Sequence, residues 1–458
     1  MQSNESVSNK EKSALALGMV CAVMGYNGIV IVSKQVLHLT FGISPEIISS
    51  VLGSMSLWNG FLDPFMGPIS DNFRSKYGRR RPFILLGALG MGLIFPFIWF
   101  VRPDWSSSYQ VFYLVICLMA FYVAFTVFAV PYGTINTELT PSYSERTKLR
   151  GIMTMTSMVV ILALGWFFPL TQYGWLGDAL TSTRILGTVI GLIMIASGVL
   201  AAYLLSTKKV ELEEGKGKIS MLKSFSQMAR DRIYLSLVAT GILTLFSASL
   251  VDYLGDYLII FFVFEGDIVK GASVAAMSAS MTQILGFLSV LVIGKTMSHM
   301  DKKKLLGICM AITLLGNLSK WFLLRPEFPL GPLLLPLYLA PAHVGFWMLF
   351  SSMMADYPDY HEFRYGKRCE GTIFAIHGWF TKVAAAIALT ASGFILTYSG
   401  FRAELGGEQA EGTFLSMRLL IVFLPSICLA LGLLALKMMP LDKVRMLEIR
   451  KQLDERKV

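Results

Sequence analysis

Charged and polar side chains that can bind an ion or a ligand occur inside long apolar stretches of this sequence. Asp63 stands in the segment SLWNGFLDPFMG, and Asn59 lies one helical turn before it on the same face. Pro64 lacks an amide hydrogen and therefore frees a carbonyl in the preceding turn. A charged side chain near a bilayer centre costs about 2.5 to 3.5 kcal/mol, so Asp63 needs a partner, a cavity or a changed protonation state. We expect Asn59 and Asp63 to share one ligand.

A lysine in the second half of the chain is the expected counter-charge of Asp63. Lys382 lies within FAIHGWFTKVAAA. A proton or metal ion on Asp63 would leave this lysine without its counter-charge and would change how the two halves attract each other. That would couple an ion to a movement of the halves. A static bridge that only holds the halves together is the alternative.

Five further residues are candidates for binding a ligand. Asp252 and Asp256 share a helix face, and because two ionised carboxylates repel, one is expected to stay protonated or to bind a cation or substrate hydroxyls. The alternative places both acids at the outer interface. His343 and Trp347 are also one turn apart, and a tryptophan facing a polar cavity typically stacks on a sugar. The alternative is packing against lipid or core. His377 is a further titratable candidate.

The composition predicts that a membrane surrounds these residues. Of 458 residues, 54% are hydrophobic and 15% charged, with a mean hydropathy of +0.60, whereas soluble domains are about a quarter charged. The apolar residues form blocks of roughly 20 to 28, long enough to cross a hydrocarbon core of about 30 Å. Five cysteines without paired or metal-ligand spacing are expected to be core residues. The predicted spans are 13–37, 46–70, 83–102, 109–137, 151–173, 183–205, 233–264, 272–297, 305–324, 332–357, 371–398 and 413–439.

The net charge of +10 is distributed unevenly along the chain. Lys and Arg gather in every second connection between spans, which predicts an even number of spans and both termini in the cytoplasm. Short basic clusters flanked by spans do not indicate nucleic-acid binding. The polar start leads into an apolar stretch that is too long for a signal peptide and lacks an A-x-A-like site, so we expect the first helix to be retained.

The spans divide into two sets of six. The predicted parts are a cytoplasmic tail at 1–12, a first bundle at 13–205, a cytoplasmic linker at 206–232, a second bundle at 233–439 and a cytoplasmic tail at 440–458.

A pattern of glycine, aspartate and a basic cluster follows the second span and recurs after the eighth. We expect the glycine to permit close helix approach, and the aspartate and basic cluster to latch a cytoplasmic helix end to its neighbour. An ordinary basic loop is the alternative for the second copy. The residues are Gly67, Asp71, Arg79 and Arg80 in the first copy and Gly294, Asp301 and Lys302 in the second.

Three segments resemble the glycoside-pentoside-hexuronide:cation symporters: LDPFMGPISDNFRSKYGRRRPFIL, AVPYGTINTELTPSYSERTKL and ADYPDYHEFRYGKRCEGTIFAIHGWFTK. The resemblance implies the all-α fold of the major facilitator superfamily, with twelve transmembrane helices in two pseudo-symmetric bundles. It also implies uptake of a glycoside, oligosaccharide or uronide together with a cation, by alternating access. A monomer in a bacterial inner membrane, without a cofactor, is expected.

The resemblance assigns roles to individual residues. Asp63 and Thr126 fall on positions of the cation site, Lys382 on the charge network, and Trp347 on the sugar-stacking tryptophan. Asn59 replaces a second cation-site aspartate of that family. A site with one carboxylate suits a proton better than Na⁺, so we expect coupling to H⁺, with transient Na⁺ at Asp63 as the alternative.

The expected sugar pocket departs from the family pattern. Ala129 replaces a sugar-binding aspartate, and Val23 replaces another, with Asn27 one turn further on and Tyr26 beside it as candidate substitutes. The family's arginine has no match around 153–156. The substrate is therefore open, and an anionic sugar is compatible with Lys382 and the two histidines.

Two other functions remain open. A symporter of lysolipids or other amphiphiles belongs to the same superfamily and would need an apolar lateral cleft. A membrane sensor that does not transport is an alternative of a different class. No nucleophile elbow, nucleotide-binding loop or metal-ligand spacing occurs, so an enzyme is not expected.

Overall fold

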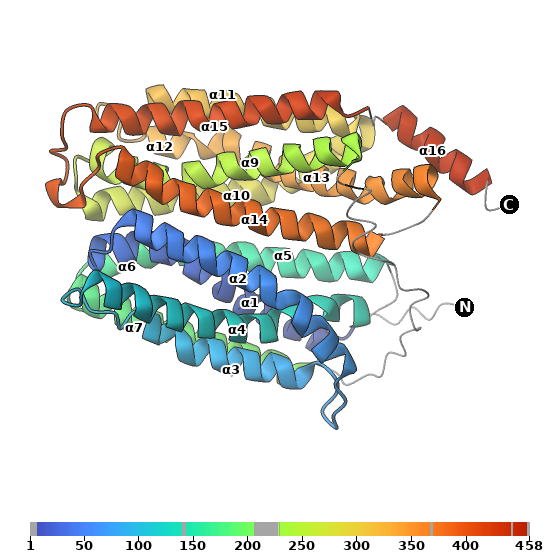
Figure 1. The fold of residues 1–458 in the computed structure, drawn as a ribbon, viewed down its shortest axis with the longest axis horizontal. Coiled ribbons are helices and arrows are strands. Elements are labelled where there is room, and N and C mark those ends of the chain that lie inside the picture. The colour runs from blue at the N-terminus through green and yellow to red at the C-terminus, as the bar shows by residue number, and fades with distance from the viewer. Residues whose placement is uncertain are drawn as a thin grey trace. The chain divides into compact units, whose positions relative to one another are not determined.

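The structure is a computed structural model that describes residues 7–139, 143–205, 228, 230–366, 370–440 and 443–455. The chain divides into two compact units, unit 1 (Met1–Glu213) and unit 2 (Glu214–Val458). Every regular element in the described residues is a helix (Figure 1).

Unit 1 contains six long helices within its described part, with a π-helix (η1) after the first and a short helix (α6) after the fifth. α3 packs against α4 and α7, α1 packs against α5 and α7, and α2 packs against α4. The elements are α1 (Asn9–Gln35), η1 (Val36–Thr40), α2 (Pro45–Asn72), α3 (Arg81–Ile98), α4 (Ser107–Leu139), α5 (Tyr143–Gly165), α6 (Phe167–Gln172) and α7 (Ala179–Leu204).

Unit 2 repeats this arrangement in its described part. Its first long helix, α9, also ends in a π-helix (η2) and packs against α14 and α15, while α13 packs against α10 and α11. The elements are α9 (Arg232–Tyr257), η2 (Leu258–Val263), α10 (Ile268–His299), α11 (Lys302–Leu323), α12 (Gly331–Leu334), α13 (Pro336–Tyr365), α14 (Glu370–Tyr398), η3 (Ala403–Leu405), α15 (Thr413–Met438) and α16 (Lys443–Glu455).

Each predicted span overlaps one of the twelve long helices of the described chain. Ten of these helices are long and apolar enough to cross a membrane, and α2 and α13 are the two that fall short. The reason is their polar content: α2 carries Asn59 and Asp63, and α13 carries His343 together with several acids near its C-terminal end. Both helices that fall short thus carry predicted site residues.

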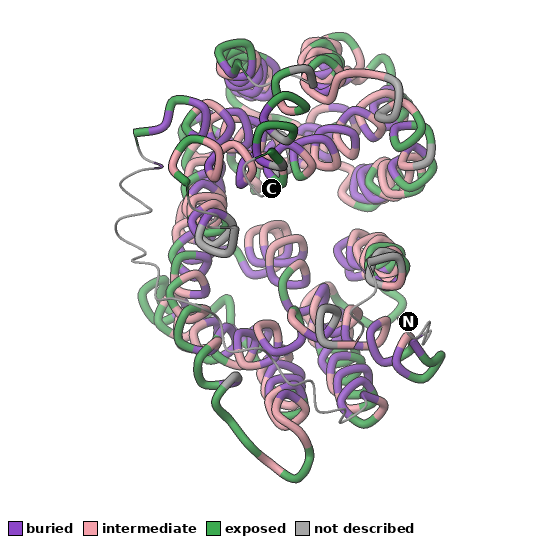
Figure 2. The backbone as a smooth tube through the Cα atoms, turned by 90° about the vertical axis from the view of Figure 1, so that its right-hand side faces the viewer, coloured by how far each residue is buried: buried purple, intermediate pink, exposed green. Residues whose placement is uncertain are grey.

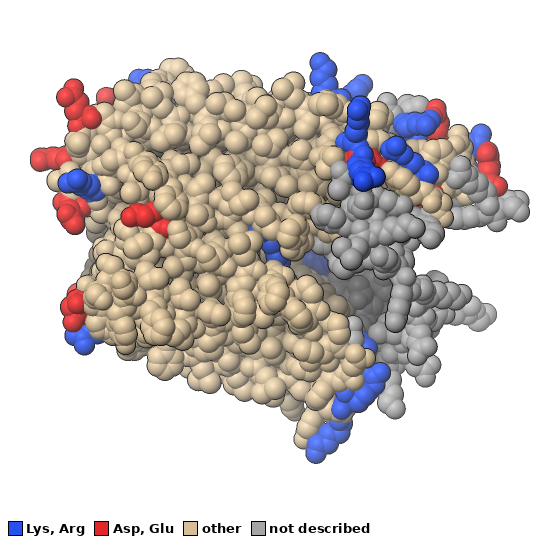
Figure 3. Space-filling view, in the orientation of Figure 1, with Lys and Arg blue, Asp and Glu red and all other residues tan. Residues whose placement is uncertain are grey.

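The surface also fits a membrane environment. Large apolar side chains are exposed at intervals of four along α2, at Leu57, Phe61, Phe65 and Ile69, and each is 48% to 58% exposed. On the face shown in Figure 3, charged side chains gather towards the helix ends, and most of the surface between them is uncharged. An apolar surface of this extent would be unfavourable in water and is expected in contact with lipid.

An arginine near the start of the last long helix clasps the third helix in each unit. In unit 1, Arg184 of α7 donates from Nε to the carbonyl oxygen of Trp99 at 3.2 Å. In unit 2, Arg418 of α15 donates from Nη2 to the carbonyl oxygen of Trp321 at 2.6 Å. A cation near the C-terminal carbonyls of a helix is stabilised by the helix dipole.

The opposite ends of these helix pairs are clasped as well. Arg81, at the start of α3, donates to the carbonyl oxygens of Ala202 at 2.6 Å and Tyr203 at 3.0 Å. Lys303, at the start of α11, donates to the carbonyl oxygen of Met439. The clasping residues are separated equally in the two units, since Trp99 follows Arg81 by the same interval as Trp321 follows Lys303.

In each unit, a glycine of the last long helix lies where that helix approaches the third helix. A Cβ added at Gly198 of α7 would collide with Ala88 of α3. A Cβ added at Gly432 of α15 would lie 2.9 Å from the Cε atom of Met310 of α11. Gly198 follows Arg184 by the same number of residues as Gly432 follows Arg418. Ala88 likewise follows Arg81 by the same number as Met310 follows Lys303. The helices α1, α3 and α7 of unit 1 therefore pack in the same way as α9, α11 and α15 of unit 2.

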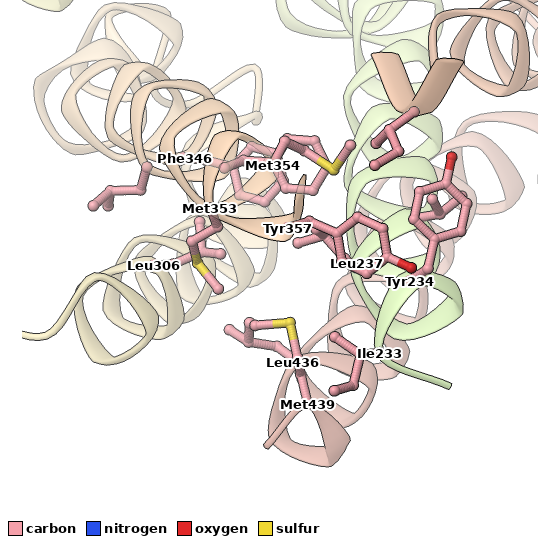
Figure 4. Close-up of a cluster of buried hydrophobic side chains, with 14 of the residues drawn as sticks. Ile233, Tyr234, Leu237, Leu306, Phe346, Met353, Met354, Tyr357, Leu436 and Met439 are labelled. Carbon is pink, nitrogen blue, oxygen red and sulfur yellow. The ribbon is translucent and has the colours of Figure 1, made fainter. Parts of the chain in front are cut away.

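A C-terminal helix that we did not predict completes one end of unit 2. Ile449 and Leu453 of α16 are buried in a cluster with Tyr357 of α13 and residues of α9 and α15. Ile233, Leu436 and Tyr357 belong to this cluster (Figure 4), and buried residues line the inner faces of the helices generally (Figure 2). Helix α16 is thus part of the packed core, although we expected the tail to be only a polar extension.

Candidate functional site

The predicted cation-site residues of unit 1 come together between α2 and α4. Thr126 of α4 donates from Oγ1 to the Oδ1 atom of Asn59 at 3.1 Å and lies 3.4 Å from the Oδ1 atom of Asp63. Asn59 and Thr126 are each 3% exposed, and Asp63 is half-buried. Three different oxygen groups, an amide, a hydroxyl and a carboxylate, therefore meet within a helix pair.

The local sequence explains this geometry. The i, i+4 spacing places Asn59 and Asp63 on the face of α2 that packs against α4. Pro64 and Pro68 lie inside α2 without ending it, which removes two amide donors from the helix just after the acid. Carboxylates and other oxygens are the groups that bind protons and hard cations.

Two other predicted residues of unit 1 lie on α1. Tyr26 is 39% exposed, and its ring centroid is 6.2 Å from that of Phe125, the neighbour of Thr126 in α4. Asn27 is half-buried. Tyr26 therefore packs against α4, the helix that carries Thr126.

The predicted pair on α13 of unit 2 is directly bonded. Trp347 donates from Nε1 to the Nε2 atom of His343 at 3.1 Å. The tryptophan ring also makes near-perpendicular contacts with Phe346, at 5.2 Å between centroids, and with Phe350, at 6.1 Å. Trp347 is half-buried, so part of its surface remains accessible while its orientation is held from several sides.

His377 of α14 joins the same aromatic group. Its ring centroid is 5.6 Å from that of Phe350, the residue that also contacts Trp347. The Nδ1 atom of His377 is buried and has no hydrogen-bond partner within the described chain. An unsatisfied buried nitrogen is unfavourable and is available to a ligand or a water molecule.

The remaining charged candidates can be placed only in part. Asp256 is half-buried near the C-terminal end of α9, and Lys382 is half-buried in α14. Asp252 lies on α9, but its side chain is outside the described residues. The predicted pairing of Asp63 with Lys382 joins the two units and stays a prediction.

Two of the predicted latch residues, Asp301 and Arg80, make hydrogen bonds inside their own units. Asp301 caps α11, accepting a hydrogen bond from the amide of Lys303 at 2.7 Å. Arg80 is buried and donates to the hydroxyl of Ser70 in α2 at 3.5 Å. Arg79 is half-buried just before α3, and the side chain of Asp71 is outside the described residues.

The close helix approach expected at Gly67 is not seen within unit 1. Among the described residues, no atom of the unit lies within 4 Å of the position that a Cβ would take there. At Gly294 the nearest atom, in Met348, is 3.6 Å away, which is an ordinary contact. The second copy is instead tied to α13 by an ion pair between Lys302 and Asp356 at 2.7 Å. A further ion pair joins Arg364 of α13 to Asp231, which precedes α9, at 3.5 Å.

One polar group inside a membrane helix was missed by sequence reasoning. Lys320 of α11 is 3% exposed and donates to the Oδ1 atom of Asn317 at 2.7 Å. It lies four residues before the end of its predicted span, 305–324, where a lysine normally extends to the membrane surface. The signal that could have found it is the asparagine one turn earlier, which offers an acceptor inside the helix bundle.

Comparisons with known proteins agree with this architecture. The family described as MFS/sugar transport protein matches residues 14–443. An uncharacterized symporter of Bacillus subtilis (strain 168), YnaJ, is 24% identical over 91% of this chain and 88% of its own length. The glucuronide carrier protein homolog of Escherichia coli (strain K12) is 23% identical over 91% of this chain and 89% of its own length.

A solved structure matches the whole fold. The bacterial homolog of the human lysosomal transporter Spinster, in its inward-facing and unoccupied conformation, aligns with a TM-score of 0.69 at 14% identity. The alignment covers 94% of this chain and 98% of that one. The predicted all-α fold of twelve helices in two six-helix bundles is thereby confirmed.

Proposed function

The chain belongs to the MFS/sugar transport protein family, and from this premise we propose that it is a cation-coupled symporter of a sugar or glycoside. It is a transporter and not an enzyme, like the family and the relatives that it matches. We place it in a bacterial inner membrane with both termini in the cytoplasm, as the distribution of Lys and Arg indicates. Alternating access of the two bundles is the mechanism.

The oxygen cluster of Asn59, Asp63 and Thr126 is the observation that supports coupling of transport to a cation. A carboxylate costs free energy inside a membrane helix unless it is compensated. The hydroxyl of Thr126 lies 3.4 Å from the Oδ1 atom of Asp63 and offers it a neutral hydrogen bond. A proton or cation on Asp63 would remove the charge, and ion binding would then alter the electrostatic balance between the bundles.

We propose H⁺ as the coupling ion. A proton needs a single basic oxygen, which Asp63 supplies. Hard cations such as Na⁺ are held by several oxygens, and this cluster offers one amide, one hydroxyl and one carboxylate group. Binding of Na⁺ would therefore rely on a ligand set with only one formal negative charge.

The substrate side of the proposal rests on the aromatic group of unit 2. Trp347 is held by its hydrogen bond to His343 and by the rings of Phe346 and Phe350. A ring that is already oriented loses little entropy on stacking against a sugar. His377 offers a polar atom beside this platform. The glucuronide carrier protein homolog among the relatives favours testing uronides first.

Counterflow in proteoliposomes tests the function. Vesicles loaded with a candidate sugar and diluted into labelled sugar should accumulate label transiently if the protein is a carrier, and a sensor would only bind it. Neutral glycosides and uronides are compared, with and without Na⁺ and with a protonophore in the uphill assay. Uphill uptake that depends on Na⁺ and resists the protonophore would refute coupling to H⁺.

An apolar groove in unit 2 favours a second candidate, an amphiphile symporter. The groove has a volume of about 420 Å³, lies between α9 and α14, and is lined almost entirely by apolar side chains, among them Val238, Ile242 and Phe380. An acyl chain fits such a lining better than a sugar does. Exchange of labelled lysophospholipid, with no exchange of any sugar in the panel, would select this function.

A further inference from the structure

A buried amine is tied to α9 through a chain of hydrogen bonds in unit 2. Lys320 of α11 donates from Nζ to the Oδ1 atom of Asn317 at 2.7 Å. Asn317 donates from Nδ2 to the Oγ atom of Ser247 on α9 at 3.5 Å. All three residues are buried, at 3%, 2% and 2% exposure respectively. The chain therefore crosses the seam between two helices out of contact with the surface.

The same seam in unit 1 is apolar. Trp99 and Trp321 are equivalent clasp residues. Counted back from them, Ile98 stands where unit 2 has Lys320, and Phe95 stands where it has Asn317. Both unit 1 residues are fully buried.

The third member of the chain has an apolar counterpart too. Counted back from the first residues of the π-helices, Val36 and Leu258, the position of Ser247 in unit 2 corresponds to Gly25 in unit 1. A Cβ at Gly25 would closely meet the side chains of Phe125 of α4 and Met91 of α3, so apolar side chains surround this position. All three polar positions of unit 2 are thus apolar in its structural repeat.

Unit 1 therefore shows that the equivalent helices can pack without a buried polar chain. The equivalent positions of unit 1 are buried and carry no polar side chain, and a buried amine is costly in a membrane helix. Replacing buried ionic groups by apolar ones of similar volume is often neutral or stabilising. The polar chain of unit 2 is consequently not needed to build the framework.

We propose that Lys320 is a positioning residue for substrate binding, acting through Asn317 on α9. The ammonium group polarises the amide of Asn317, which strengthens the hydrogen bond that this amide donates to Ser247. Ser247 thereby fixes the rotation and position of the C-terminal half of α9. That half carries Asp256 and leads into η2, so the inference rests on the proposed sugar-transport function.

Transplanting the apolar triad of unit 1 into unit 2 tests this role. The variant combines Ser247→Gly, Asn317→Phe and Lys320→Ile. We expect it to fold, with a melting temperature close to that of the wild type, and to raise the KM for the transported sugar about tenfold, the effect of one lost charge-assisted hydrogen bond. An unchanged KM would overturn the proposal.

Single variants keep the test decisive if the triple variant does not fold. Lys320→Arg retains a cation and donors for Asn317, so its KM should stay near the wild-type value. Lys320→Met should raise KM to the level of the triple variant. A purely structural role would lower the amount of folded protein, and hence Vmax, for both variants at constant KM. Ile98→Met, the matched change in unit 1, should leave KM unchanged.

Failure of the inference is distinguishable from failure of the proposed function. A wild-type protein that exchanges none of the sugars in the panel would refute the function. A wild type that transports sugar, beside a triple variant with the same KM, would refute only the role of Lys320.

Discussion

Units 1 and 2 share a framework but keep their polar chemistry in different places. Both have a π-helix after the first helix, a basic clasp at each end of the third and last helices, and a glycine where those helices approach. In unit 1 the polar cluster is confined to the α2–α4 pair. In unit 2 it lies on α13 and also within the seam between α9 and α11.

The difference separates residues that build the fold from residues that serve transport. Features present in both units stabilise the packing of the helices within each unit. Asp63 and Trp347 each occur in one unit only, so the helix packing that the units share does not depend on them. We therefore propose that Asp63 of unit 1 binds the coupling ion and that Trp347 of unit 2 binds the substrate, and each proposal can be tested alone.

The largest effect is expected for the acid of unit 1. Asp63→Asn removes the group that exchanges a proton, so uphill accumulation of sugar should fall at least about a hundredfold, while exchange at equal concentrations remains measurable. Asp104→Asn, which changes an exposed acid paired with Arg102, is the matched control and should accumulate sugar normally. Retained uphill uptake by Asp63→Asn would remove the coupling role from unit 1.

The next effect concerns the aromatic platform of unit 2. Trp347→Ala should weaken sugar binding by about 1 to 3 kcal/mol, because stacking and the burial of a large ring are both lost. Isothermal titration or thermal shift with the transported sugar measures it. Trp379→Ala, at an exposed position of α14, is the control and should leave affinity unchanged. Equal affinities for both variants would return Trp347 to a packing role.

The clasps should affect stability rather than transport, and more strongly in unit 2. Arg418 donates at 2.6 Å and lies over the rings of Trp321 at 4.3 Å and Phe262 at 5.2 Å, whereas Arg184 donates at 3.2 Å and lies over Phe100 at 5.3 Å. We expect Arg418→Met to cost about 2 to 3 kcal/mol.

The matched change in unit 1, Arg184→Met, should cost about 1 kcal/mol, because its hydrogen bond is longer and it has one ring contact fewer. Unfolding in mixed detergent micelles compares the two variants. A larger loss for Arg184→Met would show that the clasps are not equivalent in the way that the shared framework indicates.

The sequence predicted the fold and much of the unit 1 site, because both follow from local spacing. Apolar blocks of membrane-spanning length mark the helices, and an i, i+4 pair such as Asn59 and Asp63 shares a face whatever surrounds it. Lys320 was missed because its burial depends on which side of α11 meets α9 and α15, a tertiary fact. Lysines near span ends usually reach the surface, so position alone was misleading.

The same limit applies to the glycines and to the C-terminal tail. Gly67 and Gly294 were singled out by a repeated motif, yet the close approaches occur at Gly198 and Gly432, where two helices cross. A motif records which residues recur, whereas a close approach depends on helix packing. Helix α16 was missed because its apolar residues are few and gain their stability only against the ends of α9, α13 and α15.

The smallest effect is expected at the first residue of two equivalent helices. Asp267 caps α10, accepting from the amide of Lys270 at 3.0 Å and pairing with its ammonium group at 2.9 Å, whereas Ser44, at the start of α2, makes no side-chain capping bond. Asp267→Ala should therefore destabilise the protein by about 0.5 to 1 kcal/mol at neutral pH, and Ser44→Ala by less.

The capping contribution should also depend on pH. The hydrogen bond from Lys270 holds the pKa of the Asp267 carboxyl below its usual value. A lowered folded pKa means that the stabilisation is complete above the unfolded pKa of about 3.9 and is lost as the pH falls through the folded value. The difference between wild type and Asp267→Ala in chemical denaturation should shrink over that acidic range. A difference that stays constant there would mean that the aspartate stabilises α10 through something other than its charge.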